Sequence, residues 1–241
     1  MRFGFYLNPI VRLRDRGMLG EPEPAVVAGL AAAAGAQYIL AGLTPDGGDL
    51  TERDIRLIRD VTRVDMLLVI PQDHGLVEPV VKLQPDGVIL VAPGWDGKRD
   101  FRPVQLEVDE EEISSVASAF KSAGLRVSIL IEPNPNTFKV AAKRRLEGVV
   151  LDASAYVTAH AEDEAQAELD KITDSAMTAH KYGLEIAVGH GLTYHTLGPL
   201  AAIKYIDEIY AGRTIAARAI INGIDRAIRD FIIEIDRNQM Y

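Results

Sequence analysis

Short apolar runs alternate with segments of helical periodicity along the whole chain. The runs are rich in β-branched and aromatic residues and have the length of buried strands. They predict eight strands, at residues 3–7, 38–43, 66–70, 87–91, 127–131, 148–151, 184–188 and 206–211. The segments that follow them predict helices at residues 24–34, 52–60, 76–83, 110–123, 137–145, 163–182, 197–203 and 215–235.

This alternation is typical of βα units and a parallel sheet. Eight such units within 241 residues predict an α/β fold of the (β/α)8 TIM barrel class. A doubly wound open sheet is the competing fold, but it favours a glycine-rich dinucleotide motif after the first strand, and none follows Leu7. No linker, low-complexity segment or charge block divides the sequence, so we expect a single barrel domain over residues 1–241.

Residues at the predicted helix ends agree with this alternation. Thr51 precedes a predicted helix and Asp54 follows three residues later, which is the spacing of a capping box. Gly124 and Gly183 each follow a predicted helix at the position where glycine ends helices.

Composition and charge narrow the functional classes. The formal net charge of −9 argues against nucleic-acid binding and against attachment to anionic membranes. The chain contains no cysteine, which excludes disulfides and thiolate chemistry and suits a reducing cytoplasm. The N-terminus lacks a signal-peptide layout, and residues 25–43, although long enough to span a membrane, are interrupted by Gly35. We therefore expect a cytoplasmic protein with no membrane contact.

Polar residues collect directly after the apolar runs. In a barrel these positions meet at the carboxyl ends of the strands, where barrel enzymes hold their active sites. Asp152 ends its apolar run with no turn residue directly after it and is a candidate for acid–base catalysis. Each such residue alone is more often a cap or a turn residue than a catalyst. The further catalytic candidates are Asp73 and His74, and the substrate-binding candidates are Asn8, Asp46 and Glu132.

The most informative segment is the exit of the seventh predicted strand. His190 lies there between Gly189 and Gly191, so its imidazole is placed where proton transfer near neutral pH is useful. Glycines at this point allow a ligand to approach the backbone and expose N–H groups to an anion. A tight turn whose histidine caps the backbone is the simpler alternative.

The end of the eighth predicted strand adds a charged group. Gly212 and Arg213 follow that strand, and the ends of strands seven and eight are a frequent phosphate site in barrels. The Arg213 guanidinium suits phosphate or carboxylate, although a salt bridge to a neighbouring acid is its alternative role. We predict an anion site formed by Gly189, Gly191, Gly212 and Arg213.

Several segments resemble a known family. Residues 189–195 (Gly-His-Gly-Leu-Thr-Tyr-His) resemble the strand-seven motif of the pyridoxine 5′-phosphate synthase family. Residues 10–14, 50–56, 123–129 and 211–219 are similar to its first loop, second helix, fifth strand and eighth strand with the following helix. The resemblance covers nearly the whole chain in the right order.

The resemblance implies a (β/α)8 barrel with extra helices that serve contacts in a homo-oligomer. It also implies an enzyme that joins 1-deoxyxylulose 5-phosphate to 3-amino-2-oxopropyl phosphate without a metal or an organic cofactor. A metal centre made by His74, Asp152 and His190 would lack a ligand-spacing motif, so we expect no metal.

The chain departs from the family at the ends of several matched strands. The family's Asn-Ile-Asp-His is matched by Tyr-Leu-Asn-Pro at residues 6–9, and its His-Leu-Arg-Glu-Asp by Gly-Leu-Thr-Pro-Asp at residues 42–46. Its Asn-Leu-Glu-Met is matched by residues 65–68, and its Glu-x-His in strand six by Val150 and Asp152. Its Gly-His in strand eight is matched by Gly212 and Arg213.

These departures put the family's reaction in doubt. Gly42 and Leu68 cannot transfer protons, and of the family's acid–base residues only His190 matches cleanly. Each lost acid–base group typically costs about 10²–10⁴-fold in rate. Asp46, Asp73 and His74 are the residues that are placed to substitute.

Two functional classes remain from the sequence. The first is a diverged enzyme of this family that acts on a small phosphorylated or carboxylated metabolite, with His190 as acid or base. The second is a non-catalytic barrel that binds a metabolite or a partner protein. A true pyridoxine 5′-phosphate synthase with substituted catalytic groups is a third possibility.

Overall fold

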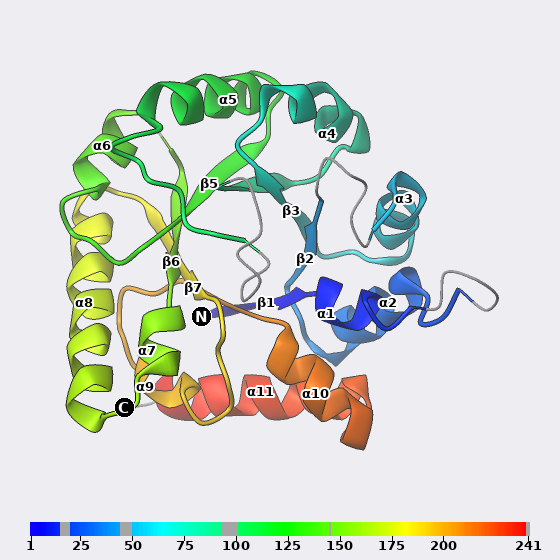
Figure 1. The fold of residues 1–241 in the computed structure, drawn as a ribbon. Helices are drawn as coiled ribbons and strands as arrows, with labels where there is room; N and C mark the ends of the chain where they lie inside the picture. The colour runs from blue at the N-terminus through cyan, green and yellow to red at the C-terminus, as the bar shows by residue number, and fades with distance from the viewer. Residues whose placement is uncertain (15–19, 44–49, 93–100, 145, 240–241) are drawn as a thin grey trace.

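The computed structural model describes residues 1–14, 20–43, 50–92, 101–144 and 146–239, and it is a closed parallel barrel (Figure 1). The strands follow one another around the barrel in chain order, and β8 pairs with β1. Their bounds are β1 (Arg2–Tyr6), β2 (Tyr38–Gly42), β3 (Asp65–Pro71), β4 (Gly87–Val91), β5 (Arg126–Ile131), β6 (Gly148–Asp152), β7 (Glu185–Gly189) and β8 (Glu208–Ala211). The predicted (β/α)8 fold is confirmed, and the ends of each predicted strand lie within two residues of those of an observed strand.

Helices surround the barrel on its outside (Figure 1). They are α1 (Asn8–Val11), α2 (Pro24–Ala34), α3 (Glu52–Val61), a 3-10 turn η1 (His74–Leu76), α4 (Val77–Leu83), α5 (Glu110–Ser122), α6 (Phe138–Lys143), α7 (Ser154–Thr158), α8 (Glu162–Lys181), α9 (Leu197–Ala201), α10 (Arg213–Asn222) and α11 (Ile224–Gln239). None of the helices described is long and apolar enough to cross a membrane.

Helix ends follow the predicted signals in part. The Thr51–Asp54 capping box is confirmed, because the Thr51 hydroxyl accepts the Asp54 N–H and the Asp54 carboxylate accepts the Thr51 N–H. The single helix predicted over residues 215–235 is wrong. Gly223 adopts a φ of 78° and ends α10, so that α11 starts in a new direction.

Two apolar layers hold the fold together. Alternate strand residues face outward and pack against the helices, as Phe3 and Phe5 of β1 do. The other strand residues point into the barrel, where Leu40, Leu130 and Tyr210 belong to a second cluster. Gly4 leaves the space that Tyr210 fills, since a Cβ there would lie 2.5 Å from the tyrosine ring.

A charged cluster closes the amino-terminal end of the barrel. Glu208, only 2% exposed, accepts from Arg2 at 2.6 Å and from Arg126 at 3.3 Å, and the Tyr210 hydroxyl also donates to it. Both guanidinium groups lie over the Tyr38 ring, at 5.1 and 5.4 Å from its centre. The carboxylate thus has charged and polar partners on several sides, which offsets much of the cost of its burial.

Candidate active site at the carboxyl end of the barrel

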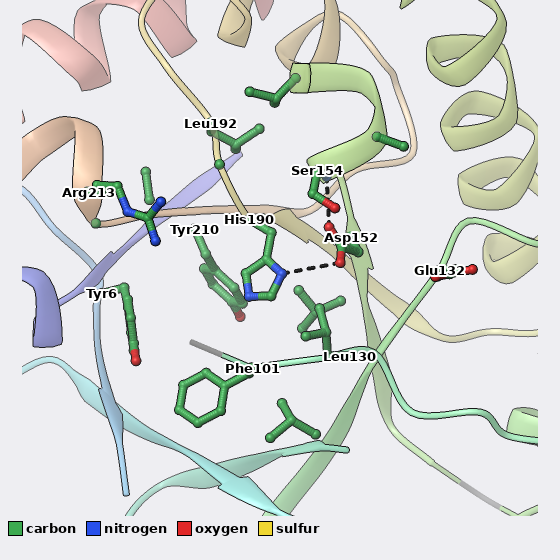
Figure 2. Close-up of a pocket in the computed structure, with 18 of the residues that line it drawn as sticks. Tyr6, Phe101, Leu130, Glu132, Asp152, Ser154, His190, Leu192, Tyr210 and Arg213 are labelled. Carbon is green, nitrogen blue, oxygen red and sulfur yellow. Dashed lines mark hydrogen bonds and ion pairs between the residues drawn. The ribbon is translucent and has the colours of Figure 1, made fainter. Parts of the chain in front are cut away.

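A cavity of about 830 Å³ opens at the carboxyl ends of the strands. Its lining joins the ends of β5 to β8 with inward-facing side chains of β1 to β4 (Figure 2). The predicted site residues that line it are Glu132, Asp152, Gly189, His190, Gly191, Gly212 and Arg213. Seven of the eleven predicted site residues therefore share one cavity.

The polar centre of the cavity is the pair of Asp152 and His190. Asp152 ends β6 and is 3% exposed, and its Oδ2 lies 3.3 Å from His190 Nδ1. Its Oδ1 accepts the backbone N–H of Ser154 at 2.7 Å, which holds the carboxylate in place (Figure 2). Because β6 and β7 are neighbours paired through Asp152 and Gly189, the two side chains meet by register.

The environment of Asp152 keeps its carboxylate ionised. Burial acts to raise the pKa of Asp152, but the hydrogen bonds and charge of His190 and the bonds from Ser154 outweigh it, so the pKa is lowered from its usual value. An ionised carboxylate accepts Nδ1–H and thereby leaves His190 Nε2 to take or give a proton. In this pair, the Asp152 carboxylate orients the His190 imidazole for acid–base chemistry.

The backbone at His190 is held in an unusual conformation. His190 has a φ of 70° and Gly191 has a φ of 76°, and a non-glycine residue in the left-handed region costs about 1 kcal/mol or more. The following loop is anchored because the Tyr194 hydroxyl donates to the Ala227 carbonyl at 2.7 Å and its ring packs on Phe231. The anchored loop keeps the imidazole turned toward the cavity.

The predicted anion site lies beside this pair. Gly212 is the N-cap of the ten-residue α10, so the first N–H groups of that helix lack intrahelical acceptors and favour an anion. Arg213 lines the cavity and forms no ion pair with any residue that the structure describes. A Cβ at Gly212 would lie 2.5 Å from the Tyr6 carbonyl oxygen, so the close approach of β8 to β1 requires glycine here.

Three other predicted site residues lie apart from this centre. The Asn8 side chain is buried and joins the start of α1 to the end of β2 through two hydrogen bonds, accepting the Gly42 N–H at 2.7 Å and donating to the Gly42 carbonyl at 3.0 Å. Asp73 caps η1 by accepting the Gly75 N–H, and His74 Nε2 lies 2.8 Å from Ser115 Oγ of α5. Asn8, Asp73 and His74 are not among the described residues that line the cavity.

No acidic side chain at the end of β3 points into the barrel. Leu68 faces the helices, whereas Leu67 belongs to the interior cluster, so the interior position that corresponds to the family's glutamate is Leu67. The match of residues 65–68 to the family's Asn-Leu-Glu-Met likewise places Leu67 at the glutamate and Leu68 one residue later. An apolar residue occupies the interior position in either case. The eleventh predicted site residue, Asp46, lies outside the described residues.

Aromatic side chains in the cavity were missed from the sequence. Tyr6, Phe101 and Tyr210 all line it. Tyr6 and Tyr210 occupy inward-facing alternate positions of their strands, which a strict two-residue alternation would have identified. Phe101 comes from the connection after β4, where no periodic signal exists.

The fold and the position of the site define a (β/α)8 barrel protein with its candidate site at the carboxyl end of the strands. The family model of the pyridoxal phosphate biosynthesis protein PdxJ matches residues 3–237 of the chain. The chain therefore belongs to this family.

Curated relatives span the same length. The pyridoxine 5′-phosphate synthase of Synechococcus sp. (strain JA-2-3B'a(2-13)) is 30% identical over 230 residues, covering 95% of this chain and 96% of the relative. The pyridoxine 5′-phosphate synthase of Desulforapulum autotrophicum is 31% identical over 226 residues, covering 94% of this chain and 95% of the relative. A crystal structure of KGPDC from Streptococcus mutans superposes with a TM-score of 0.66 at 13% identity, covering 99% of this chain and 98% of that one, which is a similarity of fold.

Proposed function

We propose that this protein is a cofactor-free barrel enzyme that acts on a small phosphorylated or carboxylated metabolite. The observation that supports the proposal most is the shared cavity, in which an oriented Asp152–His190 pair lies beside Arg213 at a helix N-terminus. The named activity of the curated relatives, pyridoxine 5′-phosphate synthesis, supports chemistry of the condensation or ring-closure kind.

Each residue has a distinct part in this proposal. The N–H groups at Gly212 and the Arg213 guanidinium bind the anionic group of the substrate. Asp152 orients the imidazole, and His190 Nε2 moves the proton at the reacting atom. Glu132, at the cavity rim, is available for polar contacts with the substrate.

The residues that replace the family's histidine and glutamate are poorly suited to the synthase reaction. Gly42 offers no side chain, and a Cβ there would lie 2.6 Å from both the Phe101 ring and the Tyr6 hydroxyl. Leu67 is apolar. Asp73 and His74 are outside the described lining of the cavity, so they are poor substitutes. The reaction we propose is therefore a relative of the synthase reaction on another substrate, and the alternatives are a non-catalytic metabolite-binding barrel and a synthase with substituted groups.

Arg213→Ala is expected to weaken binding of inorganic phosphate by about 10- to 150-fold, because a charge-assisted pair contributes about 1.5–3 kcal/mol. Calorimetric titration of phosphate into both proteins measures the change. Arg213→Lys should restore part of the affinity, since it keeps the charge and loses the fork geometry.

Thermal melts separate binding from stability. Arg213 makes no ion pair with the described residues, so Arg213→Ala should leave the melting temperature in the absence of phosphate nearly unchanged. Equal phosphate affinity in wild type and variant would show that the proposed anion site does not exist.

We also propose that the protein forms a homo-oligomer. Helices α2 and α10 both pack on α11 and leave apolar side chains in solvent, with Ile220 and Ile221 exposed by 74% and 83%. Light scattering at micromolar concentration should give a mass well above the 26.3 kDa of one chain, and Ile221→Glu should lower it. A monomer at every concentration would contradict this proposal.

A further inference from the structure

The segment that follows β7 forms a compact turn. The Thr193 N–H donates to Thr196 Oγ1 at 3.0 Å, and the Thr196 N–H donates to Thr193 Oγ1 at 3.2 Å. Before this turn, His190 and Gly191 have positive φ values, and a left-handed backbone at a non-glycine residue persists only where its surroundings hold it. The two threonines fix the shape of the turn, whereas its position against the barrel depends on contacts with other elements.

Tyr194 supplies the contact with another element. Its hydroxyl donates to the Ala227 carbonyl of α11 at 2.7 Å, and its ring meets Phe231 of the same helix edge to face, with ring centres 5.1 Å apart. Phe231 in turn packs on Phe3 of β1, with ring centres 5.2 Å apart. Burial raises the pKa of Tyr194 to about 12, so its hydroxyl remains a donor at neutral pH. Tyr194 thus ties the segment to α11 and, through Phe231, to the barrel.

Arg218 of α10 lies over the Tyr194 ring. Its guanidinium carbon is 4.3 Å from the ring centre, within the range of a cation–π contact. One guanidinium nitrogen donates to Asp230 Oδ2 of α11 at 2.9 Å. Asp230 also pairs with Arg226 at 3.4 Å, so it keeps a partner when Arg218 is changed. Arg218 therefore joins α10 to α11, which pack side by side (Figure 1), and confines the Tyr194 ring.

Helix α10 is in contact with both parts of the site. It begins at Arg213, in the proposed anion site, and it carries Arg218 further along. Neither Tyr194 nor Arg218 is among the described residues that line the cavity. Their contacts therefore act on a bound ligand through the backbone that leads from Tyr194 back to His190.

We propose that Tyr194 and Arg218 are positioning residues for His190. They hold the segment after β7 so that His190 Nδ1 stays 3.3 Å from Asp152 Oδ2 and the imidazole stays in the cavity. This inference rests on the proposed function, in which His190 moves a proton, and it adds the residues outside the cavity on which that role depends.

The position of the proton on the His190 ring reports the alignment of His190 with Asp152. At mildly alkaline pH, where histidine side chains are ordinarily neutral, nitrogen NMR of histidine-labelled protein distinguishes the Nδ1–H form from the Nε2–H form. His190→Gln removes one of the five sets of histidine signals and thereby assigns those of His190. In the wild type the Nδ1–H form should exceed the Nε2–H form by about 10-fold or more, because the Asp152 carboxylate accepts from Nδ1.

Two variants weaken the contacts of this segment in different ways. Tyr194→Phe deletes the hydroxyl and keeps the ring, whereas Arg218→Met deletes the charge and keeps much of the side-chain volume. Each should lower the ratio of the Nδ1–H form to the Nε2–H form by about 3- to 10-fold, because a misaligned hydrogen bond weakens steeply. Arg218→Lys should restore part of the ratio, since it keeps a cation near the ring.

Tyr205 and Lys204 offer matched controls. The Tyr205 ring stacks on His180 with ring centres 4.8 Å apart, and the Lys204 ammonium lies 5.8 Å from the centre of the Tyr205 ring. Both residues precede β8 and are absent from the described lining of the cavity. Tyr205→Phe and Lys204→Met change similar groups in a similar contact, and they should leave the His190 ratio unchanged.

The outcomes separate this inference from the proposed function. An unchanged ratio in either Tyr194→Phe or Arg218→Met, or an equal fall in the two controls, would overturn the inference. A wild-type His190 that is mainly in the Nε2–H form would overturn it as well. Calorimetric titration of inorganic phosphate measures the anion site separately, and the affinity should be the same in the wild type and in both variants. Failure of phosphate to bind to the wild type would overturn the anion site, while the NMR ratios would still decide the role of Tyr194 and Arg218.

Discussion

Purified protein supplied with 1-deoxyxylulose 5-phosphate and 3-amino-2-oxopropyl phosphate is expected to form pyridoxine 5′-phosphate at least about 10⁴-fold more slowly than a typical enzyme of the family. The reason is the loss of two proton-transfer groups at Gly42 and Leu67, each worth about 10²–10⁴-fold. Fluorescence or chromatographic detection of the product measures the rate. The Synechococcus relative, named pyridoxine 5′-phosphate synthase, is the positive control.

A restoring variant sharpens this prediction. Gly42→His returns the family's histidine, but its Cβ would lie 2.6 Å from the Phe101 ring and from the Tyr6 hydroxyl. We expect no recovery of synthesis from this change alone, because the rings occupy the space that the imidazole needs. Wild-type turnover of about 1 per second or faster would contradict the account of the substituted positions.

The second large effect is expected at the closed end of the barrel. Glu208→Ala should lower the free energy of unfolding by about 2–4 kcal/mol, because it leaves the buried Tyr210 hydroxyl without its acceptor and leaves Arg126 with the half-exposed Glu185 as its remaining ion-pair partner among the described residues. This range allows for solvent screening at the two partly exposed arginines, 43% exposed for Arg2 and 24% for Arg126. Urea denaturation at neutral pH measures it.

Glu185→Ala is the matched control for Glu208→Ala. Glu185 also pairs with Arg126, at 2.9 Å, but its side chain is half exposed. Its loss should cost about 0–1 kcal/mol, as is usual for surface pairs. Similar losses for the two variants would show that burial of Glu208 adds nothing to the stability of the barrel.

The same cluster predicts a loss of stability at high pH. Burial, and then the charge of Glu208, raise the pKa of Tyr38 to about 12. A raised pKa in the folded state means that the stabilisation is complete below the unfolded pKa near 10 and is lost as the pH rises toward 12. The decline in stability of the wild type should therefore begin near pH 10, and it should be smaller in Glu208→Ala. Urea denaturation of both proteins between pH 8 and pH 12 measures the difference.

Much of the fold followed from the sequence because its signals are local. Apolar runs at residues 87–91 and 148–151 identify buried strands without any knowledge of their neighbours. The Thr51–Asp54 capping box depends on four residues. The break between α10 and α11 was missed although Gly223 is visible in the sequence, since a glycine inside an apolar periodic segment does not reveal its backbone angle.

The site followed from the sequence less completely because its contacts are not local. Strand order was enough to place Asp152 and His190 on neighbouring strand ends, but their 3.3 Å approach depends on the register of β6 and β7. Phe101 enters the cavity from a connecting segment, and its position depends on the space that Gly42 leaves. Asp73 and His74 follow β3 as predicted, yet their side chains contact η1 and α5 instead of the cavity.

The position of a bound phosphate tests the central claim most directly. A crystal structure of the protein with inorganic phosphate should place the phosphate oxygens within about 3 Å of the backbone nitrogens at the start of α10 and of the Arg213 guanidinium. A phosphate bound at the opposite side of the cavity, or an empty cavity at a saturating ligand concentration, would contradict the account.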